Sequence, residues 1–239
     1  MSMETTDLSA LRRDTKLKTR RIAADYVADG LREAIQSGRL ADGAVLSQAA
    51  IAEHFEVSRV PVREAMRQLL AEGLIQWQAH HVAVVRTLSP ERIGELFDHR
   101  ALLEGYITER AVPLIDAAAI SSLRSKNEQM REIADHERWL KANGEFHDVI
   151  LAVGGDETGF ELIEWLRSRS RRYVRMWSGP GELHRPEEAG REHDEIVRLI
   201  ELGDAPGARA AVEAHVRHTG ERLVAYGRAR EQAAVADGG

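Results

Sequence analysis

The fold of this chain is decided by the stretch Val57-Ser58-Arg59-Val60-Pro61-Val62-Arg63-Glu64-Ala65-Met66-Arg67-Gln68-Leu69-Leu70-Ala71-Glu72-Gly73-Leu74-Ile75. Its apolar residues recur at three- and four-residue spacing, which predicts a helix with one core-facing side. Arg59, Arg63 and Arg67 step by four and share the opposite side. The stretch therefore predicts an amphipathic helix with a cationic outer face.

The ends of this helix and a shorter helix before it complete a recognisable motif. Ser58 is a favourable N-cap, Pro61 is tolerated in the first turn, and Gly73 ends the helix. The upstream helix is predicted from the spacing of Leu46, Ile51, Ala52 and Phe55. Two short helices joined by a tight link are typical of a helix-turn-helix, whose second helix lies in the major groove of DNA.

The polar residues of the second helix then have distinct expected roles. Arg59 and Arg63 lie near its N-terminus, where a guanidinium can pair with guanine or clamp a phosphate. Ser58 and the first amides can hold a phosphate, and Arg67 is placed to contact the DNA backbone. Pro61, in the first turn of the helix, is also expected among the DNA-contacting residues. The alternative is a surface helix whose arginines are only solvated, and charge alone does not separate the two.

The flanking segments favour the DNA-binding interpretation. A longer helix is predicted over residues 19–37, with Ile22, Val27, Leu31 and Ile35 on one side. After the motif, Ile75 with Trp77 and then residues 82–85 predict two short strands around a turn at His80-His81. Three helices followed by a hairpin wing make a winged helix-turn-helix domain.

This first part of the chain resembles the GntR superfamily of bacterial transcription regulators. The resemblance is carried by Ile35, Gly38, Leu40, Gly43, Leu46, Ile51-Ala52, the run from Val57 to Ala65, and Glu72-Gly73-Leu74. Val82 stands where the family usually has a wing glycine, and Ala50 where it often has a charged residue. We therefore expect His80 or His81 to supply the wing contact, and base readout to rest on the first two arginines of the helix.

Composition excludes several classes of protein. The chain has 239 residues, of which 43% are hydrophobic and 5% aromatic, and it has no cysteine. A disulfide framework and a thiolate metal site are therefore excluded. No apolar run approaches the roughly 20 residues of a membrane span, and the polar N-terminus lacks a signal-peptide core. We expect a cytoplasmic protein without membrane contact.

Charge and pattern divide the chain. Residues 1–88 hold 12 basic and 11 acidic side chains, a net charge of +1, and the remaining 21 basic and 28 acidic give −7. We expect a flexible tail over residues 1–17, the DNA-binding domain over 18–88, an all-helical effector-binding domain over 89–228 and a disordered tail over 229–239. Six antiparallel helices are predicted in the second domain, beginning at Ser89-Pro90-Glu91. The fold class is mostly α.

Histidines are the candidate chemistry of the helical domain. His147, His193 and His215 fall in three different predicted helices, and Asn143 precedes His147 by four residues, on the same helix face. Imidazoles that meet inside a bundle, with one oxygen ligand, can hold a divalent metal. From spacing alone, capped or solvated histidines are the commoner outcome.

The second part resembles the FCD ligand-binding domain of the FadR-like branch of these regulators. The resemblance rests on Arg100, Leu103-Glu104, Phe146-His147, Glu192-His193, Ile196, Gly203-Asp204, Ala208 and His215. Many members bind a metal through an aspartate and three histidines, which implies Asn143, His147, His193 and His215 here. Asparagine replaces the aspartate, so we expect weaker binding. Zinc is the first choice, with nickel or manganese as alternatives.

We expect a small carboxylate effector that completes the coordination of the metal. Arg100 is the candidate second anchor, and its alternative is a pair with Glu104 within the same helix. Arg171 and Arg175 are further candidates, although a run of arginines cannot all face inward.

These expectations together describe a homodimeric repressor. It would bind palindromic operator DNA and release it when the metabolite binds. One alternative is a metal-free member that binds a larger organic ligand. A metal-dependent hydrolase is the less favoured rival, because no general base is placed by a recognisable motif, and we expect no enzyme activity.

Overall fold

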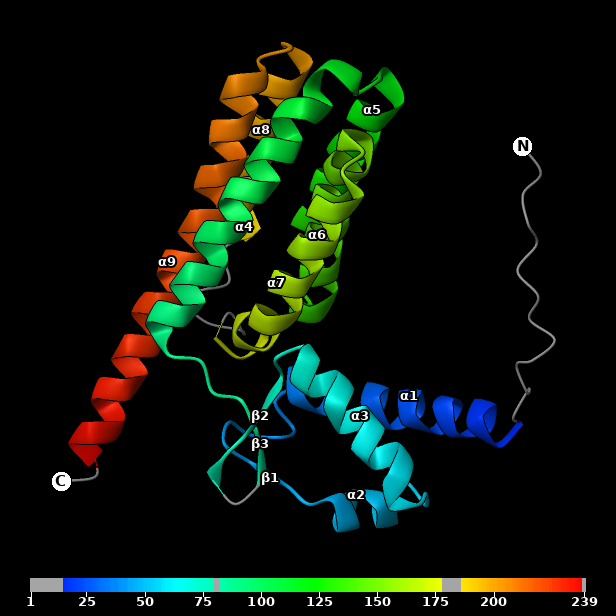
Figure 1. Cartoon of the computed structure of the whole chain (residues 1–239). Helices are drawn as coiled ribbons and strands as arrows, with labels where there is room; N and C mark the ends of the chain where they lie inside the picture. Colours follow the sequence, from blue (N-terminus) through cyan, green and yellow to red (C-terminus); the bar gives the residue numbers. More distant parts are fainter. Residues whose placement is uncertain (1–14, 80–81, 178–185, 238–239) are drawn as a thin grey trace, which may run out of the picture. The chain divides into compact units, whose positions relative to one another are not determined.

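The computed structural model describes residues 15–79, 82–177 and 186–237 (Figure 1). The chain forms two compact units, of which one ends at Arg86 and the other begins at Thr87, apart from the short segment Gln36–Gly38 that groups with the second. Helices dominate both units, so the prediction of a mostly α fold with a winged helix-turn-helix and a helical bundle is confirmed.

The first unit is a three-helix domain with a small antiparallel sheet. Its elements are α1 (Thr15–Gln36), β1 (Val45–Leu46), α2 (Gln48–His54), α3 (Arg59–Ala71), β2 (Ile75–Trp77) and β3 (Ala83–Val85). The strand order is β1-β3-β2, with Gln76 opposite Val84 and Val45 also opposite Val84. The two strands of the wing were predicted. Strand β1 was missed, because two residues are too few to show the alternating pattern of a strand.

Helix α3 buries the apolar side that the sequence predicts. Val62, Met66 and Leu69 are fully buried, and Gly73 adopts the left-handed conformation that ends the helix. Ser58 occupies the N-cap position with extended backbone, but its hydroxyl makes no capping hydrogen bond within the described residues. The expected side-chain cap is therefore wrong, and the exposed hydroxyl is left without an intrahelical role.

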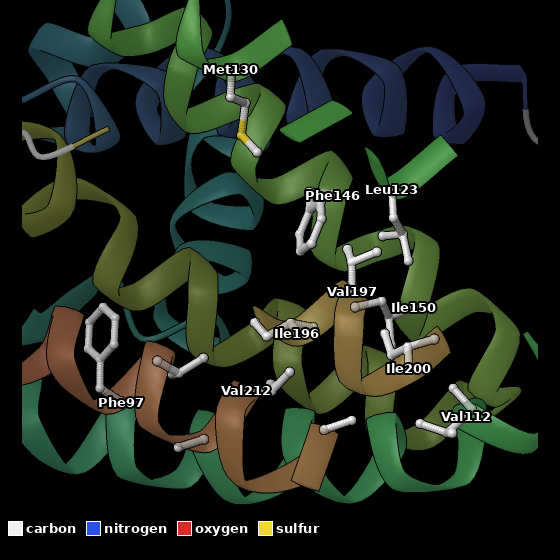
Figure 2. Close-up of a cluster of buried hydrophobic side chains, with 14 of the residues drawn as sticks. Phe97, Val112, Leu123, Met130, Phe146, Ile150, Ile196, Val197, Ile200 and Val212 are labelled. Carbon is white, nitrogen blue, oxygen red and sulfur yellow. The ribbon is translucent and has the colours of Figure 1, made fainter. Parts of the chain in front are cut away.

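The second unit contains six α-helices among the residues that the structure describes. They are α4 (Pro90–Ala111), α5 (Ala117–Arg131), α6 (His136–Gly154), α7 (Glu157–Trp177), α8 (Pro186–Glu201) and α9 (Ala205–Asp237), with a 3₁₀ turn over Val112–Leu114. Ser89 caps α4 by accepting a hydrogen bond from the Arg92 amide, as the sequence start signal predicts. The core is contributed by several helices, including Phe146 and Ile150 of α6 and Ile196 of α8 (Figure 2).

Both ends of the described chain are more helical than expected. Helix α1 begins at Thr15, inside the predicted tail, while residues 1–14 lie outside the described residues. Helix α9 continues to Asp237, so the disordered tail expected from residue 229 is wrong up to that point. The segment after Gly227 is rich in alanine, arginine and glutamate, which have high helix propensity, and Arg228 pairs with Glu91 of α4 at 3.1 Å.

No helix within the described ranges is both long enough and apolar enough to span a lipid bilayer.

Candidate nucleic-acid interface and metal centre

The outer face of α3 carries the cationic side chains. Arg59, Arg63 and Arg67 are all exposed, as is Ser58 at the start of the helix. Arg67 is already engaged by Glu64, with 3.2 Å between its Nη1 and Oε1. Arg59 and Arg63 therefore offer the more available guanidinium groups near the helix N-terminus.

Other residues proposed for DNA contact are placed differently. Pro61 is buried, so it shapes the first turn of α3 and does not present a surface to a ligand. His80 and His81, expected at the wing turn, lie outside the described residues. On the wing strands, Trp77 is 40% exposed.

Helix α3 is tied to α1 by contacts that the sequence analysis missed. The Arg32 guanidinium donates to both carboxylate oxygens of Glu72, at 2.8 and 2.6 Å, and Gln68 Nε2 donates to Asp25 Oδ1 at 3.0 Å. The hydrogen bond with Glu72 raises the pKa of Arg32 above its ordinary value. Because a bidentate pair fixes both distance and orientation, it sets how α3 is presented.

The three histidines meet inside the helical unit. His147 of α6, His193 of α8 and His215 of α9 are buried, and one ring nitrogen from each lies within 4.8 Å of the others. His147 Nε2 and His215 Nε2 are 3.2 Å apart. His193 stacks on Phe146, with ring centroids 4.2 Å apart. Residues 68 positions apart in the chain are thus brought into contact by bundle packing.

Neighbouring oxygen atoms fix the orientation of two of these rings. Glu192 Oε2 lies 2.7 Å from His215 Nδ1, and Asn127 Oδ1 lies 3.2 Å from His193 Nδ1. Because each oxygen accepts a hydrogen bond from Nδ1–H, the Nε2 atom of each neutral ring carries the lone pair. His193 Nε2 is buried and has no hydrogen-bond partner in the described part of the chain. Such an arrangement is typical of metal-ligating histidines.

Burial keeps His147 and His193 neutral. Desolvation lowers the pKa of His147 and of His193 well below the ordinary histidine value, with a smaller contribution from nearby positive charge. Burial raises the pKa of Glu192, but its hydrogen bonds to His215 and His218 outweigh burial and lower it to about 2. A neutral imidazole is the protonation state that metal binding requires.

Asn143 lies beside two of the histidines and has an unpaired, buried oxygen. It lies one turn before His147 on α6 and lines, with His147 and His215, a cavity of about 110 Å³. Its Oδ1 is buried and, within the described residues, accepts no hydrogen bond. A buried carbonyl oxygen without a partner costs about 1–3 kcal/mol, which coordination to a cation would recover. Three imidazole nitrogens and this oxygen fit a divalent metal.

Arg100 pairs with Glu104 of the same helix, which is the alternative to an effector contact that the sequence left open. Arg100 Nη2 lies 3.0 Å from Glu104 Oε1, and Arg167 Nε lies 3.5 Å from the same atom. Glu104 is 1% exposed. Burial raises its pKa, but the two guanidinium groups lower it by more, so the pKa lies below its ordinary value. Arg167 also pairs with Asp148 at 2.7 Å and with Glu164 at 2.9 Å, so the two guanidinium groups are balanced by carboxylates. His147 Nδ1 lies 3.8 Å from Glu104 Oε2.

Arg171 and Arg175 do not reach the histidine cavity. They line an open groove of about 680 Å³ that shares Arg100 and Asn143 with that cavity. Arg171 lies 3.5 Å from Glu164, and Arg175 pairs with Glu137. The structure thus brings together Asn143 and the histidines with Arg100 at the edge, and places the other two arginines in the adjoining groove.

Sequence reasoning missed the residues that support this cluster. Asn127 lies on α5 and Arg167 lies on α7, and no sequence pattern on these helices indicates that either residue is near the histidines. Glu192 could have been noticed, because it immediately precedes His193 in the sequence. Its carboxylate contacts His215 of α9 and not its neighbour His193.

Comparison with known proteins supports this division of roles. Residues 23–84 match the family described as bacterial regulatory proteins, gntR family, and residues 95–218 match the FCD domain. The gluconate operon transcriptional repressor of Bacillus subtilis is 35% identical over 128 residues, which cover 52% of each chain. The transcriptional repressor RspR of Escherichia coli is 25% identical over 81% of this chain and 85% of its own.

A solved structure agrees with these relatives. A GntR family transcriptional regulator from Pseudomonas syringae pv. tomato matches with a TM-score of 0.53 and 26% identity, over 93% of this chain and 99% of that one. These proteins are transcription regulators and not enzymes, which removes the hydrolase alternative. The chain therefore belongs to the GntR family of bacterial transcription regulators, with an FCD domain forming its second part.

Proposed function

We propose that this protein is a metabolite-responsive repressor that binds a palindromic operator as a homodimer and releases it when a small carboxylate binds at a metal in the helical unit. The observation that carries the proposal is the buried cluster of His147, His193 and His215 beside the unpartnered oxygen of Asn143. Two atoms of this group, His193 Nε2 and Asn143 Oδ1, are buried without a hydrogen-bond partner within the described residues, and an unpaired polar atom destabilises a core unless a ligand binds it.

The donor set favours zinc, and nickel or manganese also accept nitrogen and oxygen ligands. All four donors are neutral, so a bound cation would keep its full charge of +2. That charge favours an anionic effector over a neutral one.

The shape of the site favours a small effector. The cavity at the histidines, about 110 Å³, is below the 300–1,000 Å³ typical of sites for drug-sized ligands. Arg100 lies at its edge and can turn an N–H toward a carboxylate, while Arg171 and Arg175 line the adjoining groove. One relative is named for the gluconate operon, and gluconate is a small carboxylate. That name agrees with the class of effector proposed here.

The test compares DNA binding by metal-loaded and metal-stripped protein, purified without a histidine tag. An operator is first selected from random duplexes, and acetate, lactate, gluconate and citrate are then titrated into the complex. We expect about one zinc per chain, and release of DNA by at least one carboxylate only when metal is bound. Equal release from stripped protein, or no metal uptake after reconstitution with zinc, would contradict the proposal and direct attention to larger ligands in the groove.

Asn143→Asp should strengthen metal binding by about tenfold or more, because an anionic oxygen replaces a neutral one at the same position. The same change should weaken the carboxylate response, since the added carboxylate makes the net charge of the site more negative by one. Competition with a zinc chelator measures the first effect, and operator release measures the second. Asn143→Ala is the matched control and should weaken metal binding; equal affinity in all three proteins would remove Asn143 from the ligand set.

A further inference from the structure

The linker between the wing and α4 is anchored by two hydrogen bonds, one in each unit. The Arg86 amide donates to the Leu74 carbonyl oxygen at 2.9 Å within the first unit, and Leu74 directly follows the glycine that ends α3. The Leu88 amide donates to the hydroxyl oxygen of Tyr173 at 2.7 Å within the second unit. Thr87 is the single residue between these two anchored residues. A short, bonded stretch of chain therefore connects the end of α3 with α7.

Tyr173 is a firmly held anchor for the linker. Its side chain is 2% exposed and belongs to the hydrophobic core of the helical unit. The Leu88 side chain is partly buried against the same core. Because packed side chains enclose the tyrosine ring, its hydroxyl follows any movement of α7 and carries the Leu88 amide with it. The hydroxyl thus connects two segments that lie 85 positions apart in the sequence.

The same helix borders the proposed effector site. Val174, the residue after Tyr173, lines both the histidine cavity and the adjoining groove. Ser170 and Arg171 of α7 also line the groove. Consecutive residues of an α-helix are only about 1.5 Å apart along its axis, and a helix moves as a rigid element. A carboxylate that displaces Val174 therefore displaces Tyr173 as well.

We propose that the Tyr173 hydroxyl transmits effector binding to the linker through its hydrogen bond with the Leu88 amide. The inference rests on the proposed function and adds the route by which the effector site regulates DNA binding. Movement of α7 at the cavity shifts Leu88, and Arg86, two positions earlier, passes the shift to the carbonyl that follows α3. Tyr173 is not among the described residues that line the cavity or the groove, so it acts as a positioning residue.

Tyr173→Phe tests this route in the full-length, zinc-loaded protein, because it removes the hydroxyl and keeps the buried ring. Operator dissociation constants are measured with and without acetate, lactate, gluconate and citrate, and their ratio is the coupling factor for each carboxylate. Coupling between two sites is commonly about 5- to 150-fold, and in Tyr173→Phe the factor should fall to about twofold or less. Zinc content, carboxylate affinity of the DNA-free protein and operator affinity without carboxylate should stay at wild-type values.

Tyr106→Phe on α4 is the matched control. It removes the hydroxyl of an exposed tyrosine, which accepts a hydrogen bond from Arg110 at 3.1 Å on the same helix. Because this hydroxyl contacts neighbouring turns of α4 and not the linker, the control variant should keep the full coupling factor.

Loss of coupling in Tyr173→Phe alone, with zinc and carboxylate binding unchanged, supports the route, because a general loss of packing would weaken those bindings too. An unchanged coupling factor, weakened carboxylate binding, an equal loss in Tyr106→Phe, or release of DNA by Tyr173→Phe without carboxylate would each overturn it. If the wild type responds to a carboxylate and Tyr173→Phe responds equally, the proposed function stands and only the route is wrong. A wild type that responds to none of the four would remove the proposed function and this inference with it.

Discussion

Replacing Arg63 with alanine should weaken operator binding by about a hundredfold or more while leaving the fold unchanged. A bidentate contact between an arginine and a base contributes about 1–3 kcal/mol, and a symmetric dimer loses two such contacts. Arg63 is exposed on α3, on the side away from the buried Val62 and Met66, so its removal leaves no cavity. Gel shifts at fixed salt with the selected operator, together with circular dichroism, measure both expectations.

Arg67→Ala is the matched control for Arg63→Ala. Arg67 lies one turn further along α3 and is held by Glu64, so it should contribute mainly to nonspecific phosphate contact. Its removal should weaken selected and scrambled DNA alike and reduce the salt dependence by about one unit per site. Unchanged operator binding by Arg63→Ala, or equal specificity losses in both variants, would contradict the assignment of α3 as the recognition helix.

His193→Gln should abolish stable metal binding and, with it, the response of the DNA complex to carboxylates. A metal present at a thousand times its dissociation constant stabilises the folded protein by about 4 kcal/mol, so the variant should lose several degrees of melting temperature in zinc. In the presence of chelator, the variant and the wild type should melt closely together. Elemental analysis and thermal melts with and without zinc provide the measurements.

Glutamine is chosen over alanine because His193 is fully buried and stacks on Phe146. Alanine would open a cavity there and destabilise the metal-free protein as well. His218→Gln is the control: His218 is half exposed and reaches the cluster only through Glu192, at 2.9 Å. It should keep its metal. An equal loss of stability by His193→Gln in chelator would show that His193 serves packing and not coordination.

Elements with long periodic patterns could be predicted from the sequence, and short or unpatterned ones could not. Helix α3 was predicted with its buried side, because thirteen residues repeat the helical period. Strand β1 was not, because two residues have no period and pair only through β3. The continuation of α9 to Asp237 was missed because Gly227 and a polar composition suggested an end, whereas helix propensity and the Arg228–Glu91 pair continue the helix.

The sequence by itself determined the two kinds of domain and the residues that could do chemistry. Periodicity, capping signals and ordered motifs depend on residues close together in the sequence, so they can be recognised in a single sequence without a structure. The three histidines and Asn143 were candidates on that basis, and their role as metal ligands stays a prediction.

Only the tertiary structure decided which side chains meet. His147 and His215 approach within 3.2 Å, Asn127 holds His193, and Arg32 clamps Glu72 across 40 residues of chain. Such contacts depend on the crossing angle and register of packed helices, which are set by the shapes of buried side chains from several segments at once. No local pattern encodes that joint packing, so the supporting residues of both sites came from the fold alone.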